Sequence, residues 1–188
     1  MNICTDRMRC FIGCSVSPSD QSALDALIQS RAGAGWRLIP AANYHLTLCF
    51  LGDQLPATLS ALVERLRTAV PRRPCRGHAL ALAPFPTSTA PLLALELVPD
   101  TALRALHAAV AGCVAATGIL CEGSVFRPHI SLARGAGKLR AATMELDLSF
   151  NELCLFQSIS TPAHRRYERL DSLTLDNGCA PPEGGADG

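Results

Sequence analysis

Apolar residues along this 188-residue chain follow two spacings, one typical of helices and one typical of strands. The predicted helices cover residues 18–31, 56–70 and 100–117. The predicted strands cover residues 10–16, 36–39, 43–51, 78–83, 92–98, 129–133, 145–150, 152–158 and 166–175. Short strands that are interleaved with helices and joined as hairpins favour an α+β fold, with two antiparallel sheets facing each other and helices outside.

One short pattern occurs twice, once in each half of the chain. It reads histidine, apolar, hydroxyl, apolar, at residues 45–48 (HLTL) and again at residues 129–132 (HISL). Because side chains alternate faces along a strand, the histidine and the hydroxyl of each copy share one face, and the apolar residues point into the core. A predicted helix precedes each copy in the chain. The pattern therefore predicts that two similar halves of the chain build one site.

The residue types in the two copies suit acid–base chemistry. Imidazole titrates near neutral pH, so one of His45 and His129 can donate a proton while the other accepts one. The hydroxyls of Thr47 and Ser131 can bind the non-bridging oxygens of a phosphate held between the histidines. The alternative to a catalytic role is a structural one, in which the histidine and hydroxyl of each strand form a partly buried polar pair. The pattern alone leaves that alternative open.

Other chemistries find less support in the sequence. A metal site needs three or four ligands, and the two motifs supply one imidazole each with no neighbouring carboxylate. No G-x-S-x-G elbow marks Ser131 as a nucleophile, and no G-x-x-x-x-G-K-[ST] loop is present. We therefore expect neither a metal nor another cofactor. Phe, Tyr and Trp make up 5% of the chain and offer few platforms for base stacking, although Tyr44, Phe85 and Phe126 are expected near the predicted cleft strands.

Composition restricts the partners and the compartment. The formal net charge is +1, so an anion site must come from local arginines, and Lys138 is the only lysine among 17 basic residues. The nine cysteines occur without a C-x-x-C pair, which favours free buried thiols in a reducing cytoplasm. No stretch has the length and apolarity of a membrane span, and the N-terminal residues show no secretory signal. We expect a cytoplasmic monomer without a stable protein partner.

The ends of the chain differ from its centre. Residues 1–7 precede the first apolar run and are predicted to be an extension. Residues 177–188 are rich in proline and glycine and are predicted to be a disordered tail. The two-lobed domain then covers residues 8–176.

The flanks of both motifs resemble a known family. Residues 40–53 (PAANYHLTLCFLGD) resemble the Pro…Asn-x-His-x-Thr-x-x-Phe-Leu-Gly signature of the two-histidine phosphoesterases, and residues 126–134 (FRPHISLAR) match their second signature. Within that superfamily the chain looks most like the bacterial RNA 2′,3′-cyclic phosphodiesterases, historically called 2′-5′ RNA ligases. The resemblance covers about residues 8–175.

The resemblance implies a bilobal, pseudo-twofold fold, a function and a role for each motif residue. It implies hydrolysis of a terminal RNA 2′,3′-cyclic phosphate to a 2′-phosphate in a cleft between the sheets, without metal, and weak reverse 2′-5′ ligation. His45 would be the proton donor and His129 the proton acceptor. Thr47 and Ser131 would bind the phosphate, and Arg134 would supply positive charge. Arg134 has the opposite strand parity to the histidine of its own motif, so it must reach the cleft from a bulge or from the strand end.

The chain departs from the family pattern at three positions. Ser131 stands where threonine is commoner, and it keeps the hydroxyl. Ala42 stands where an acidic residue is common, and Cys49 where an arginine often sits. Strand parity places Cys49 on the face of His45, so we expect weaker contacts to RNA beyond the terminal nucleotide.

Two other functions remain open from the sequence. The chain could cleave another small cyclic or 2′-5′ nucleotide instead of RNA ends. It could also be a non-catalytic module that binds RNA ends, although binding alone does not need two titrating groups.

Overall fold

The computed structural model describes residues 6–85, 91–120, 125–139, 145–161 and 165–176. The strands in chain order are β1 (Met8–Ser15), β2 (Trp36–Leu38), β3 (His45–Gln54), β4 (Cys75–Phe85), β5 (Leu92–Pro99), β6 (His129–Gly135), β7 (Asp147–Phe150), β8 (Glu152–Ser160) and β9 (Arg165–Thr174). The helices are α1 (Pro18–Arg31), α2 (Pro56–Ala69), α3 (Thr101–Ala116) and the 3₁₀ turn η1 (Ala41–Asn43). The predicted extension (residues 1–7) and tail (residues 177–188) lie mostly or wholly outside the described residues.

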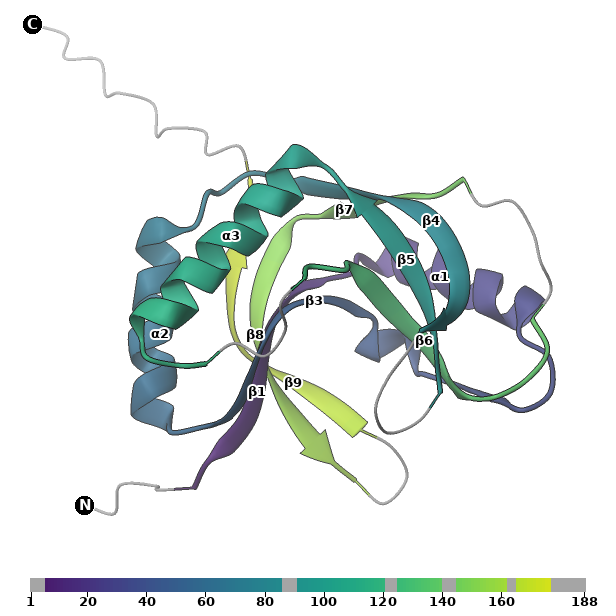
Figure 1. The fold of residues 1–188 in the computed structure, drawn as a ribbon, viewed down its shortest axis with the longest axis horizontal. Coiled ribbons are helices and arrows are strands. Elements are labelled where there is room, and N and C mark those ends of the chain that lie inside the picture. Colours follow the sequence, from purple (N-terminus) through teal and green to yellow (C-terminus); the bar gives the residue numbers. More distant parts are fainter. Residues whose placement is uncertain (1–5, 86–90, 121–124, 140–144, 162–164, 177–188) are drawn as a thin grey trace, which may run out of the picture.

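Within the described residues, all the strands join one strongly curled antiparallel sheet (Figure 1). Its order is β7-β4-β5-β6-β3-β1-β8-β9, and β2 pairs with β6 beside this path. The two histidine strands, β3 and β6, are central neighbours, but they pair only at Leu46 and Ile130. The sheet therefore consists of two antiparallel halves that diverge from one narrow junction. The predicted α+β class is confirmed, and the two expected sheets are continuous at this junction.

The helices cover the outer, apolar side of the sheet. Helices α2 and α3 pack on each other and α3 packs on β3, β4 and β5, whereas α1 packs on β6 (Figure 1). Helix α1 begins as predicted, because the Ser17 side chain accepts a hydrogen bond from the backbone N–H of Asp20 and Pro18 takes the first helical position. Among the described helices, none is long and apolar enough to cross a membrane.

Each histidine strand contains a bulge one residue after its hydroxyl. On β3, Thr47 and Cys49 pair with consecutive residues of β1, so Leu48 has no partner there. On β6, Ser131 and Ala133 pair with consecutive residues of β5, so Leu132 is the extra residue. A bulge reverses the alternation of side chains beyond it. In both histidine strands, the side chains that follow the bulge therefore point to the opposite face from the one that simple alternation predicts.

The cysteines follow the expectation of free thiols only in part. In the described part of the chain, the free cysteines are buried: Cys10, Cys14, Cys75, Cys113 and Cys154. Cys49 is disulfide-bonded, so the prediction is wrong for that residue. Burial raises the pKa of the Cys14 thiol well above its usual value, which keeps it protonated at neutral pH.

Candidate active site

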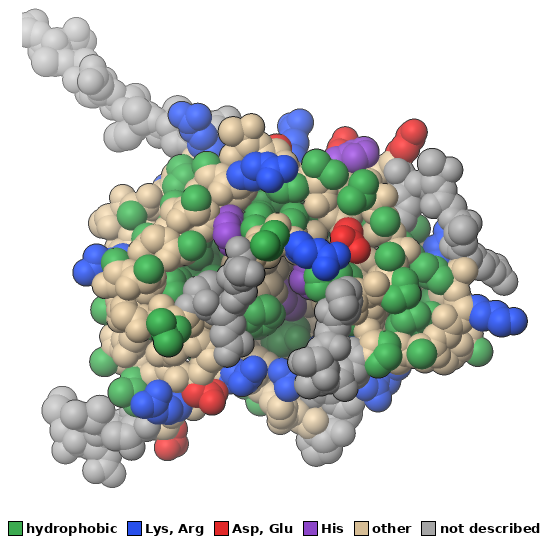
Figure 2. Space-filling model, viewed as in Figure 1, with side chains coloured by type: hydrophobic (Ala, Val, Ile, Leu, Met, Phe, Trp, Pro, Cys, Tyr) green, Lys and Arg blue, Asp and Glu red, His purple; other side chains and the backbone are tan. Residues whose placement is uncertain are grey.

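A cleft of about 750 Å³ lies on the concave side of the sheet, where its two halves diverge. All the residues predicted to form the site line it: His45, Thr47, His129, Ser131 and Arg134. Figure 2 shows the hollow, with histidine side chains inside it and basic side chains around its border. The structure therefore brings together the two motifs that the sequence places in opposite halves of the chain.

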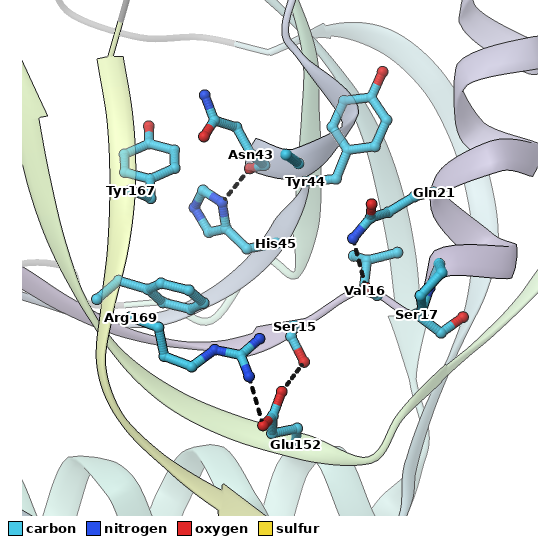
Figure 3. Close-up of a pocket in the computed structure, with 13 residues that line it drawn as sticks. Ser15, Val16, Ser17, Gln21, Asn43, Tyr44, His45, Glu152, Tyr167 and Arg169 are labelled. Atoms are coloured by element: carbon cyan, nitrogen blue, oxygen red, sulfur yellow. Dashed lines mark hydrogen bonds and ion pairs between the residues drawn. The ribbon is translucent and has the colours of Figure 1, made fainter. Parts of the chain in front are cut away.

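The imidazole of His45 has a fixed orientation. Its Nδ1–H donates a hydrogen bond to the backbone carbonyl of Asn43, with an Nδ1–O distance of 2.7 Å (Figure 3). Asn43 is itself held, because its side-chain amide donates to the carbonyl of Arg165 at 2.8 Å. A neutral imidazole that donates from Nδ1 keeps the lone pair on Nε2. Nε2 is therefore the atom of His45 that is free to exchange a proton.

His129 is oriented in the same way from the other half of the molecule. Its Nδ1–H donates to the backbone carbonyl of Arg127, two residues earlier, at 2.9 Å. The ring of Phe85 stacks on the imidazole with a centroid distance of 4.0 Å, and the Arg127 guanidinium lies 4.5 Å from the centroid of the Phe85 ring. Glu96 is the cross-strand neighbour of His129 and pairs with Arg127.

Both imidazoles bind a proton less readily than a free histidine. Burial lowers the pKa of His45 from 6.5 to about 4; the Asn43 carbonyl opposes this shift, and the charge of protonated His129 adds to it. Burial also lowers the pKa of His129, and the Arg127 carbonyl and Glu96 oppose that shift. Both rings are therefore mainly neutral at pH 7 in the empty cleft.

Aromatic rings enclose His45. Phe11 lies 4.7 Å and Tyr167 4.8 Å from it, between ring centroids, and Phe156 lies 5.9 Å away. Beyond His45 is a second hollow of about 310 Å³, where Glu152 accepts hydrogen bonds from Ser15 and Arg169 (Figure 3). The aromatic rings account for the desolvation of His45.

The bulges decide which later residues face the cleft. On β6 the bulge turns the side chain of Arg134 towards the cleft. A bulge or a strand end is what the sequence predicts there, because simple alternation would point Arg134 away from the cleft. On β3 the bulge turns Cys49 into the core, with 3% of its surface exposed, and presents Phe50, with 49% exposed, to the cleft. The prediction that Cys49 shares the face of His45 is therefore wrong. Phe50 is instead the pseudo-twofold counterpart of Arg134.

Sequence reasoning missed several residues of the cleft. Of the three aromatic residues expected there, only Phe85 lines the main cleft, since Tyr44 is buried beside Asp25 and Phe126 stacks on His107. The rings and arginines that do line it were not singled out: Phe11, Phe50, Tyr167, Arg9, Arg37 and Arg165. Alternation along β1 could have shown which face of the strand carries Phe11. It could not show that β1 lies beside the His45 strand, because no local sequence signal marks which strands become neighbours.

The described residues offer no ready metal site. No group of three or more His, Cys, Asp or Glu side chains comes together among them. The described lining of the main cleft contains arginines and hydroxyls but no carboxylate. Its donor set therefore suits an anion.

Comparison with known proteins agrees with this geometry. The sequence profile of the LigT-like phosphoesterase family matches residues 16–79, which include the first histidine motif. A solved structure described as a phosphoesterase is 21% identical, with 90% of this chain and 99% of that chain covered and a TM-score of 0.76. Apo Escherichia coli LigT is 20% identical, with 91% and 99% covered and a TM-score of 0.74. A Thermus thermophilus protein is 24% identical, with 89% and 98% covered and a TM-score of 0.73.

A search among curated proteins gives no match. The structural neighbours establish the fold, and the profile match adds the sequence around His45. The two histidine motifs that face one cleft agree with the similarity to the two-histidine phosphoesterases. The resemblance to the LigT-like phosphoesterases is confirmed to this extent: the family profile matches residues 16–79, and the structural neighbours share the fold.

Proposed function

We propose that the protein hydrolyses the terminal 2′,3′-cyclic phosphate of RNA to a 2′-phosphate by metal-independent acid–base catalysis. The observation that supports this best is the pair of imidazoles that face one cleft, each with Nδ1 bonded to a backbone carbonyl and Nε2 left available, where the described lining contains no carboxylate. Escherichia coli LigT, which has the same fold, has been crystallised with 3′-AMP and with phosphate. A nucleotide with a phosphate at its ribose 2′ or 3′ position therefore fits the kind of site that we infer here.

In the proposed reaction, a water molecule is the nucleophile. His129 Nε2 accepts a proton from this water as its oxygen attacks phosphorus. The bond from phosphorus to the ribose 3′ oxygen breaks, and His45 Nε2–H gives that oxygen a proton. Hydroxyl groups of Thr47 and Ser131 donate to the non-bridging oxygens, and Arg134 stabilises the charge that develops on them.

The lowered pKa of His45 sets a condition on its role as donor. His45 must carry a second proton, on Nε2, when the 3′ oxygen leaves. The negative charge of a bound phosphate favours the imidazolium and raises its pKa, so substrate binding itself supplies this condition. The enzyme then binds its substrate together with a proton.

The same groups can join two RNA ends. When a 5′-hydroxyl end of RNA takes the place of water, His129 accepts the proton of that hydroxyl as its oxygen attacks the cyclic phosphorus. His45 again protonates the departing 3′ oxygen, and the product carries a 2′-5′ phosphodiester bond. Water is present in large excess, so we expect ligation to be weak.

The product tests the proposal directly. The purified protein, in the presence of EDTA, is incubated with an oligoribonucleotide ending in a 2′,3′-cyclic phosphate, and phosphorus NMR identifies the product. We expect a 2′-phosphate and no dependence on metal. A 3′-phosphate would overturn the assignment of donor and acceptor, and tight binding without turnover would favour a binding module.

A further inference from the structure

Two arginines lie directly opposite each other on neighbouring strands at one end of the cleft. Antiparallel pairing of β2 with β6 sets Arg37 opposite Arg134, and both line the cleft. Side chains in directly opposite positions have Cβ atoms about 5 Å apart, and like charges there destabilise the sheet. An anion bound between the two guanidinium groups would offset this repulsion.

Neither arginine has a partner within the described part of the chain. No side-chain hydrogen bond or ion pair is present there for Arg37 or Arg134, whereas Arg67, Arg127 and Arg169 each pair with a carboxylate. The described lining of the cleft also contains no Asp or Glu. The positive charge of the pair is therefore available to a ligand.

The backbone holds this pair in place. A Cβ atom at Gly35 would lie 2.2 Å from the carbonyl oxygen of Ala136, so the chain before β2 packs against the chain after β6 as only glycine allows. The N–H of Ile39 also donates to the carbonyl of Leu132 at 2.9 Å. The register of Arg37 against Arg134 is therefore fixed by close packing.

The pair lies beyond the reacting centre along β6. Arg134 follows Ser131 on the cleft face, and Arg37 stands across from it, on β2. Arg134 carries five N–H donors, so it can contact the reacting phosphate and a second anion at once. Arg37 is left for the second anion alone.

We propose that Arg37, with Arg134 beside it, binds a second phosphate of the substrate, on the 5′ side of the terminal ribose. This inference rests on the proposed function, because it takes the reacting phosphate to lie between the two histidines. The second phosphate belongs either to a phosphodiester of an RNA chain or to a 5′-monophosphate. Arg37 is then a specificity residue that favours such substrates over a nucleoside 2′,3′-cyclic phosphate with a free 5′-hydroxyl.

Equilibrium binding tests the subsite without requiring turnover. Titration calorimetry compares adenosine 3′-monophosphate with adenosine 3′,5′-bisphosphate on the wild type and on Arg37→Gln. We expect the bisphosphate to bind the wild type at least about tenfold more tightly, as one charge-assisted contact implies. Arg37→Gln should remove this advantage and leave the affinity for the monophosphate unchanged.

Two further variants separate the subsite from general charge. Arg104→Gln changes an exposed arginine on α3, outside the cleft lining, and should behave as wild type. Arg37→Lys keeps the charge but not the planar fork, and should recover part of the advantage. An unchanged advantage in Arg37→Gln, or an equal loss for both nucleotides, would refute the subsite.

Turnover separates the two sources of the phosphate and the two proposals. Three substrates with a 2′,3′-cyclic phosphate are compared: a nucleoside, its 5′-phosphorylated form and a dinucleotide. If Arg37→Gln lowers kcat/KM for the 5′-phosphorylated nucleoside, the subsite binds a 5′-monophosphate. If it lowers kcat/KM for the dinucleotide, the subsite binds a phosphodiester. Turnover of all three without any preference refutes the subsite alone, whereas no turnover with Arg37-dependent bisphosphate binding refutes the proposed reaction alone.

Discussion

The imidazoles of His45 and His129 are held by the same device, in which Nδ1–H donates to the carbonyl two residues earlier. Their surroundings differ. His45 stands among aromatic rings, whereas His129 has Glu96 as a cross-strand neighbour and Phe85 stacked on its face. Burial lowers the pKa of both imidazoles, and the groups that modify this shift differ because they lie outside the motifs.

The lowered pKa of His45 predicts how stability depends on pH. The folded protein keeps this imidazole neutral down to about pH 4, whereas the unfolded chain binds the proton near pH 6.5. Stability from this residue is therefore fully present above pH 6.5 and is lost as pH falls towards 4. We expect a loss of about 2 kcal/mol in that window. Urea unfolding of wild type and His45→Gln measures it, and parallel pH profiles of the two proteins would contradict it.

The same pKa shifts predict a difference between two kinetic optima. The profile of kcat/KM reports the free protein, in which the active form needs protonated His45 and neutral His129. Both pKa values lie below 6.5, so the optimum of kcat/KM should also lie below pH 6.5. Bound phosphate raises both pKa values, so kcat should peak at higher pH. Coincident optima would show that phosphate binding does not shift these groups.

At the scale of elements, the bulges at Leu48 and Leu132 shape the site. They turn Phe50 and Arg134 towards the cleft and give one end of each histidine strand a different chemistry. Period-two reasoning placed the histidines and hydroxyls correctly because they precede the bulges. It failed at Cys49 because a bulge depends on the neighbouring strand, which a single segment of sequence does not reveal.

The junction of β2 with β6 predicts the effect of a glycine substitution. Gly35 has a φ of +98°, and a Cβ there would meet the carbonyl oxygen of Ala136 at 2.2 Å. We expect Gly35→Ala to lower the free energy of unfolding by about 2 kcal/mol and to weaken nucleotide binding by displacing Arg37. Gly112→Ala is the matched control, because that glycine lies within α3 with nothing within 4 Å of its Cβ position, and alanine there should stabilise by up to about 1 kcal/mol. Equal effects of the two substitutions in urea unfolding would contradict this account.

At the scale of the whole molecule, the halves of the sheet meet through one residue pair, Leu46 and Ile130. This narrow junction lets the sheet curl so that both motifs face one cleft. The motifs, the helices and most strands could be predicted from the sequence, because each depends on local spacing. The order of strands, and with it the aromatic enclosure of His45 by Phe11 and Tyr167, depends on contacts between distant segments.

The central claim is that His45 and His129 act as one acid–base pair on one phosphate. The most direct test is single-turnover hydrolysis of a 2′,3′-cyclic phosphate end by His45→Ala, His129→Ala and the double variant. Each single variant should lose about 10²–10⁴-fold in rate. The double variant should lose far less than the product of the two, because the residues work as a unit. Full activity in either single variant, or losses that multiply in the double variant, would contradict the account.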